Sequence, residues 1–102
     1  MRILILPSAR DDLSADGFAF YERQEAGVGD YFLESLFSDI ESLRLYAGIH
    51  PKQFGYHRLL SKRFPYAVFY DQEGKTARVW AVLDCRSDPG AIRERLASLR
   101  KK

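Results

Sequence analysis

The sequence predicts an α+β domain: an N-terminal strand, an antiparallel helical hairpin, a three-stranded antiparallel block that completes one sheet, and a short C-terminal helix. Three observations predict it. An apolar run opens the chain at residues 2–6, apolar residues recur at helical spacing in two stretches up to residue 43, and the spacing becomes two after residue 51. Because 102 residues is the length of one ordinary domain, we expect residues 1–102 to form a single domain.

The helical hairpin is predicted from residues 7–43. Pro7 suits the first turn of a helix, and Ala9, Leu13 and Phe20 continue its apolar face through residue 25. Gly17 lies inside this pattern, at a cost of about 1 kcal/mol relative to alanine. After a glycine turn at 26–29, one apolar stripe predicts the second helix: Phe32, Leu33, Leu36, Phe37, Ile40 and Leu43. A short turn between two helices favours an antiparallel pair.

The strand block is predicted at residues 54–60, 64–71 and 76–84. The polar loop around Gly74 makes the last two strands an antiparallel hairpin, and Asp88 with Pro89 begins the final helix. Strict alternation in the last strand places two sets of side chains on opposite faces, Ala77, Val79, Ala81 and Leu83 on one and Arg78, Trp80 and Val82 on the other. The pattern leaves the order of the strands in the sheet open.

Charge is segregated along the chain. Residues 1–49 carry four Lys or Arg against nine Asp or Glu, a balance of −5, whereas residues 50–102 carry twelve against five, a balance of +7. If the basic half forms one surface, it attracts an acidic partner, either a polynucleotide or an acidic protein segment.

Several function classes are not favoured by the sequence. Nucleotide-binding glycine signatures, a nucleophile elbow and Cys/His metal spacing are all missing, so we expect no cofactor and no metal. His50 and His57 are expected to be ordinary surface or strand-edge residues, and Cys85 a buried or half-buried one. A single cysteine, no signal-like leader and no apolar run near the ~20 residues of a membrane span predict a cytoplasmic protein without a membrane partner.

The stretch RLLSKRFPYAVFY, residues 58–70, combines three cations with four aromatic rings. In an antiparallel ribbon Arg58 and Lys62 share one face, with Arg63 near the turn. Arg78 and Arg86, from the following strand and its exit, extend this set into a basic surface. Tyrosines edge it: Tyr56, Tyr66 and Tyr70. Such a surface suits RNA or an acidic peptide, and the alternative is a solvated sheet face with core aromatics.

Several segments together resemble the ParE branch of the RelE/ParE superfamily, the toxins of bacterial type II toxin–antitoxin modules that include plasmid stabilisation systems. They are, in order, AxxDL at 9–13, FYER at 20–23, GVGDYFLESL at 27–36, RLLSKRFPYAVFY at 58–70 and VWAVLDCRSDP at 79–89. The resemblance covers nearly the whole chain, and it implies the same succession of strand, helical hairpin and antiparallel block.

The resemblance implies two alternative activities. ParE-like members inhibit DNA gyrase, whereas RelE-like members cleave mRNA on the ribosome. In both branches a cognate antitoxin neutralises the toxin by covering apolar surface between the helical hairpin and the sheet. The gyrase alternative places target contacts on Arg58, Lys62, Arg63, Tyr66, Arg78 and Arg86. The ribonuclease alternative gives Arg58, Lys62, Arg63 and Arg86 the role of stabilising the phosphorane.

Asp84, together with the close match to the FPY block at 64–66 and the SDP exit at 87–89, favours one branch over the other. Many family members carry histidine at this position, and no histidine or tyrosine follows Tyr70 in this chain. An aspartate is a poor proton donor near neutral pH unless its pKa is raised. The resemblance therefore favours a non-hydrolytic gyrase inhibitor. The alternatives are the ribosome-dependent ribonuclease and an inactivated toxin or binding protein of the same fold.

Overall fold

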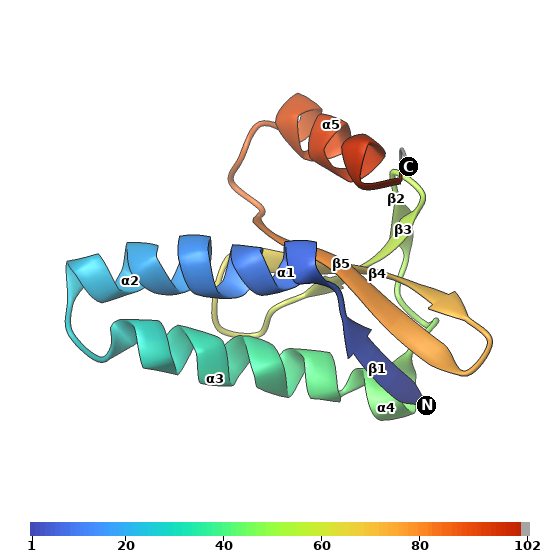
Figure 1. Cartoon of the computed structure of the whole chain (residues 1–102), viewed down its shortest axis with the longest axis horizontal. Helices are drawn as coiled ribbons and strands as arrows, with labels where there is room; N and C mark the ends of the chain where they lie inside the picture. The colour runs from blue at the N-terminus through green and yellow to red at the C-terminus, as the bar shows by residue number, and fades with distance from the viewer. Residues whose placement is uncertain (101–102) are drawn as a thin grey trace.

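The structure is a computed structural model that describes residues 1–100, and it confirms the α+β class. One five-stranded sheet has the order β1-β5-β4-β3-β2 (Figure 1). The strands are β1 (Arg2–Ile5), β2 (Lys52–Gln53), β3 (Tyr56–Leu60), β4 (Tyr66–Glu73) and β5 (Thr76–Asp84). Strand β1 runs parallel to β5, and every other pairing is antiparallel. This order, which the sequence left open, places β1 at one edge of the sheet.

The helical hairpin forms as predicted. Its first arm is α1 (Pro7–Asp11), a π-helical segment η1 (Asp12–Phe18) and α2 (Ala19–Gln24), which follow one another as one rod in Figure 1. Gly27, with φ of 93°, makes the turn, because this left-handed conformation suits glycine. The return arm is α3 (Val28–Glu41), which the short helix α4 (Leu43–Tyr46) extends.

Gly17 lies inside η1 because Phe32 of α3 packs directly against it. A Cβ atom at position 17 would lie 2.4 Å from Phe32 Cε2, well inside van der Waals contact. Phe32 is fully buried. The absent side chain therefore allows the two arms to approach closely, which offsets the lower helix propensity of glycine.

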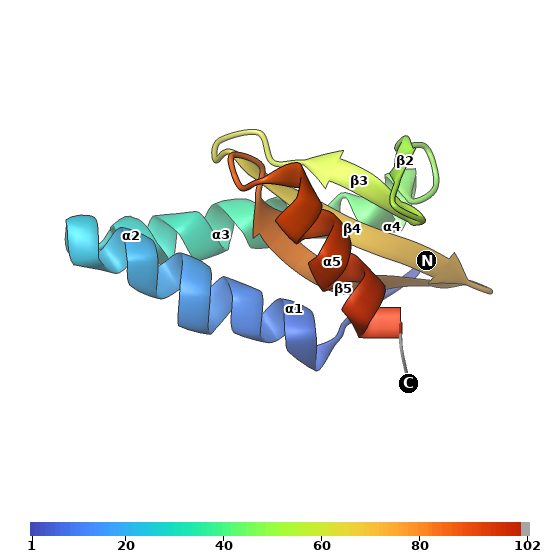
Figure 2. The same ribbon diagram turned by 90° about the horizontal axis from the view of Figure 1, so that it is seen from above.

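The sheet carries helices on both faces, and each face has its own core. The hairpin covers one face over a cluster that includes Leu13, Phe32, Leu36, Tyr66, Val68, Tyr70, Val79 and Val82. Helix α5 (Pro89–Arg100) lies across the other face (Figure 2). There Leu96 packs with Tyr56, Ala67, Phe69 and Ala81. The Tyr56 hydroxyl also donates to the Leu96 carbonyl at 3.0 Å.

The prediction that side chains of the last strand alternate strictly between the two faces is wrong, because β5 contains a bulge at Trp80. Phe69 pairs with Ala81 and Tyr70 with Val79, so Trp80 has no partner on β4. Ala77, Val79 and Val82 consequently face the hairpin, while Trp80, Ala81 and Leu83 pack on the α5 side.

Side chains from the first helical arm satisfy the bulged backbone. Ser8 donates its hydroxyl to the Trp80 carbonyl at 2.6 Å, and the Val82 N–H donates to Asp12 Oδ2 at 2.9 Å. Both contacts lie beyond the point where β1 stops pairing with β5, so they take over the role of a neighbouring strand there.

Candidate functional site

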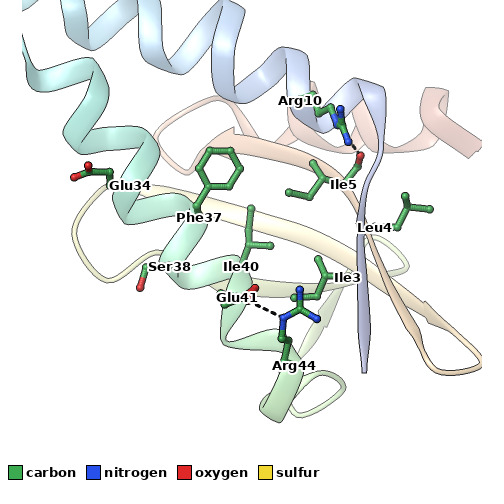
Figure 3. A pocket seen from close by; sticks show the side chains of 10 residues that line it. All are labelled: Ile3, Leu4, Ile5, Arg10, Glu34, Phe37, Ser38, Ile40, Glu41 and Arg44. Carbon is green, nitrogen blue, oxygen red and sulfur yellow. Dashed lines mark hydrogen bonds and ion pairs between the residues drawn. The ribbon is translucent and has the colours of Figure 1, made fainter.

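A groove opens between the edge strand β1 and helix α3 (Figure 3), with a volume of about 630 Å³. In Figure 3, Phe37 and Ile40 project from α3 toward Ile3 and Ile5 of β1. Ile40 is buried, whereas Phe37 keeps 46% of its surface exposed. A large aromatic side chain left this open on a groove floor is typical of a surface that a partner covers.

A second hollow of about 350 Å³ continues this groove between the two arms of the hairpin. The two share Ile5, Arg10 and Phe37, and the second adds Leu13 and Leu33. We call the combined surface the β1–α3 groove.

The rim of the β1–α3 groove is charged but balanced. Arg44 Nε lies 2.7 Å from Glu41 Oε1, and Arg10 donates to the Ile5 carbonyl at 3.2 Å. Glu34 is the remaining charged residue of the lining. Two arginines and two glutamates leave no net charge, so the apolar floor dominates recognition here.

Strand β1 adds a second means of binding. Its inner edge pairs with β5, and it is the last strand on that side of the sheet. Within residues 1–100 no strand pairs with its outer edge. An extended segment of another protein can therefore add to the sheet at β1, directly beside the groove.

The expectation that Arg58 and Lys62 share one face is wrong. Strand β3 ends at Leu60, so Lys62 and Arg63 lie in the loop before β4, where they line a small hollow against α3. Arg58 pairs with Phe69, and directly paired residues share a face, which here is the α5 side of the sheet. The cations therefore divide between the two faces.

Arg86 lies at the same end of the sheet as the β3–β4 loop. Tyr66, the first residue of β4, pairs with Asp84, and the Cys85 N–H donates to the Pro65 carbonyl at 2.8 Å. Arg86, Lys62 and Arg63 thus share one end of the molecule.

Arg78 lies apart from that end, beside the β4–β5 turn. Its guanidinium makes two hydrogen bonds of 2.8 Å to the carboxylate of Asp71 and reaches Glu73 at 3.3 Å. Arg100 of α5 also contacts Asp71, at 3.1 Å. Arg78 is therefore held inside an ion-pair network, and one continuous basic surface that includes it does not form.

Tyr66 belongs mainly to the core. It is 8% exposed, and its ring packs against Phe32 at a centroid distance of 4.9 Å. Burial is the main cause that raises the pKa of its hydroxyl, to about 12. Its exposed rim lines a shallow pocket beside Asp84.

Asp84 forms an ion pair with Arg86. Arg86 Nη2 lies 2.7 Å from Asp84 Oδ2, and Nε lies 3.0 Å from Oδ1. The Arg86 hydrogen bond is the main cause that holds the pKa of Asp84 below its usual value, against a smaller effect of burial. Asp84 is consequently an ionised acceptor at neutral pH and has no proton to donate.

The two histidines contact Tyr70 and connect it to the loop that precedes β3. His50 Nδ1 hydrogen-bonds the Tyr70 hydroxyl, which also accepts the Gly48 N–H at 2.9 Å. His57 stacks on the Tyr70 ring and donates to the His50 carbonyl at 2.7 Å. These contacts give both histidines structural partners. Across residues 1–100, no three His, Cys, Asp or Glu side chains form a group suited to a metal ion.

Cys85 is exposed, which corrects the expectation of a buried or half-buried residue. Partial burial is the main cause that raises its pKa, although Arg58 acts in the opposite direction. The thiol is therefore less readily ionised than an ordinary cysteine. None of the helices formed by residues 1–100 has the length and apolar character to cross a membrane.

The similarity of this chain to known proteins lies in its fold and not in its sequence. No family model matches the sequence, and no curated protein matches it. The chain is similar to one in a solved structure titled "Chromosomal ParDE TA system from P. aeruginosa", with a TM-score of 0.72 and 17% identity over 80% of this chain and 92% of that chain.

This chain has a ParE-like fold. The resemblance drawn from the ordered sequence motifs is thereby confirmed at the level of fold. The β1–α3 groove is a feature of this ParE-like fold that the motifs did not locate, because it depends on which strand lies at the edge of the sheet.

Proposed function

We propose that this protein is the toxin of a type II toxin–antitoxin module, that it inhibits DNA gyrase, and that a cognate antitoxin neutralises it. The observation that carries this proposal is a ParE-like fold that leaves an apolar groove open along β1 and α3. Since gyrase acts on bacterial DNA, the place of action is the cytoplasm.

The antitoxin occupies the β1–α3 groove in this proposal. The apolar floor around Phe37 and Ile40 suits the apolar face of an amphipathic helix. The free outer edge of β1 suits an extended segment that follows such a helix. The balanced charge of the rim favours a partner that binds mainly through apolar side chains.

Asp84 supports gyrase as the target in preference to mRNA. Cleavage by 2′-hydroxyl attack needs a group that moves protons, and the ionised Asp84 carboxylate has no proton to give. Arg86 is engaged with Asp84, and Arg58 faces the other side of the sheet from the β3–β4 loop. The four cations assigned to phosphorane stabilisation therefore come from both faces of the sheet, and one of them is already paired with a carboxylate.

Target contact is proposed for the cations at the end of the sheet that carries the β3–β4 loop. Lys62, Arg63 and Arg86 are exposed there and meet solvent together. Exposed cations of this kind suit an acidic patch on a protein target.

The test is production of the chain alone in a bacterium, with growth, DNA integrity and mRNA integrity followed together. The proposal predicts growth arrest with gyrase-linked DNA breaks and intact mRNA, reversed by co-production of the cognate antitoxin. Arrest with intact DNA and ribosome-dependent mRNA cleavage would transfer the function to the ribonuclease branch. Unaffected growth would identify an inactivated toxin or a binding protein.

A further inference from the structure

Ser35 of α3 carries a buried hydroxyl without a partner. The residue is 7% exposed, and its Oγ has no hydrogen-bond partner within residues 1–100. A buried hydroxyl left unpaired destabilises a fold, and native structures retain few of them. This hydroxyl lines a hollow of about 150 Å³ between α3 and the β3–β4 loop, together with Ser38, Asp39, Lys62 and Arg63. We call this hollow the α3 notch.

The α3 notch is held in shape by Ser61. Its hydroxyl donates to Asp39 Oδ2 at 2.6 Å and lies 3.4 Å from the backbone nitrogens of Arg63 and Phe64. Asp39 is 6% exposed, so the anchor of the loop on α3 is itself buried. Arg63 is further fixed over the Tyr31 ring, with its Cζ 5.9 Å from the ring centroid. The Ser61–Asp39 hydrogen bond therefore holds the β3–β4 loop against α3 before any ligand arrives.

The charge of the α3 notch specifies its ligand. Lys62 and Arg63 contribute two positive charges and Asp39 one negative charge, which leaves a balance of one positive charge. Neither cation has an ion-pair partner within residues 1–100. One oxyanion of single charge neutralises the notch, whereas a doubly charged phosphate would leave excess negative charge beside the buried Asp39.

We propose that the α3 notch binds a single carboxylate, presented as an Asp or Glu side chain by a protein partner. The hollow admits one such group, with the Ser35 and Ser38 hydroxyls as neutral donors and the two cations at its mouth. Ser38 also lines the β1–α3 groove, so the notch lies on the adjacent flank of α3. The proposal does not depend on the identity of the toxin's target.

The test is an NMR titration of the ¹⁵N-labelled full chain with N-acetyl-glutamate α-amide. N-acetyl-glutamine α-amide is the uncharged control, and inorganic phosphate is the competing oxyanion. The expected result is saturable shifts of the backbone amides of Ser35, Ser38, Lys62 and Arg63 with the glutamate compound alone. Ser35→Ala weakens this binding about tenfold, because a hydrogen bond to a charged group is lost. Ser14→Ala, at an exposed serine of the first helical arm, leaves it unchanged.

A second measurement separates binding from folding. Without ligand, Ser35→Ala melts no lower than the wild type, because the variant removes an unpaired buried hydroxyl. Lys62→Gln, at an exposed loop position, also weakens binding and leaves the melting temperature unchanged. Any one of three results would overturn the proposal. The glutamine compound could cause equal shifts, phosphate could bind more tightly than the glutamate compound, or both variants could keep full affinity for the glutamate compound.

Discussion

The buried carboxylate of Asp12 lies 3.0 Å from the guanidinium of Arg95, and it also accepts the backbone N–H of Val82 at 2.9 Å. One side chain, 3% exposed, thus connects the first helical arm to the sheet and to the C-terminal helix. The contact lies where β1 has ended, so it closes the part of β5 that no strand covers. Asp12 therefore adds a polar contact to the apolar packing that holds α5 on the sheet.

Asp12→Ala is expected to destabilise the fold at neutral pH by about 1–3 kcal/mol, because the buried Val82 N–H loses its acceptor. Asp12→Asn keeps an acceptor oxygen of the same shape and loses less. Urea unfolding of the two variants measures the difference. Equal losses in both would show that the ion pair with Arg95, and not the Val82 contact, carries the effect.

Asp12 also predicts a pH dependence. Burial raises its pKa above 3.8, and the contacts from Val82 and Arg95 only partly oppose this. A raised folded-state pKa means that the stability from Asp12 is fully present below the unfolded pKa and is lost as pH rises through the folded one. Asp12→Asn lacks this loss, so its stability relative to the wild type improves from acidic to neutral pH. If Asp12→Asn instead lost stability relative to the wild type between acidic and neutral pH, the raised pKa of Asp12 would be contradicted.

Gly17→Ala is expected to destabilise the protein by about 1–3 kcal/mol, since the new Cβ overlaps the Phe32 ring in a packed core. Gly90→Ala is the comparison variant, because its new Cβ meets only one side-chain atom, Asp88 Oδ2 at 2.9 Å, at the exposed start of α5, and a smaller loss is expected there even though this oxygen also accepts the Ala91 N–H. Thermal melting of both variants is the measurement. A neutral Gly17→Ala would mean that the hairpin arms separate at little cost.

Phe37→Ala is expected to weaken binding of the antitoxin about tenfold or more, because an aromatic side chain at the centre of a groove is a typical hot spot. Leu45→Ala removes an apolar side chain that is 82% exposed and lies outside the β1–α3 groove, so it leaves affinity nearly unchanged. Calorimetry with the purified pair checks this. A loss with Leu45→Ala alone would move the interface to α4.

The sequence predicted the elements that local periodicity controls. The strand at 76–84, the start at Pro7 and the glycine turn before α3 all appear where the pattern placed them. The bulge at Trp80 could not be predicted, because the groups that satisfy its backbone belong to Ser8 and Asp12, which are distant in sequence. Strict alternation assumes that a strand is regular, and β5 carries one extra residue at its bulge.

The candidate surfaces were harder to predict than the fold. Arg58 and Lys62 are four residues apart, and alternation puts them on one face only if the strand continues between them. It ends at Leu60, so Lys62 turns toward α3 instead. The family resemblance implied an apolar surface between the helical hairpin and the sheet, but placing it at the β1–α3 groove requires the strand order as well as the apolar pattern.

The most direct measurement of the central claim is a DNA cleavage assay with purified gyrase, supercoiled plasmid, ATP and the isolated chain. The account predicts linear DNA covalently attached to gyrase, and suppression of that product when the antitoxin is added first. The account would be contradicted if the chain left gyrase activity unchanged and produced no linear DNA, while the same preparation cleaved mRNA on ribosomes.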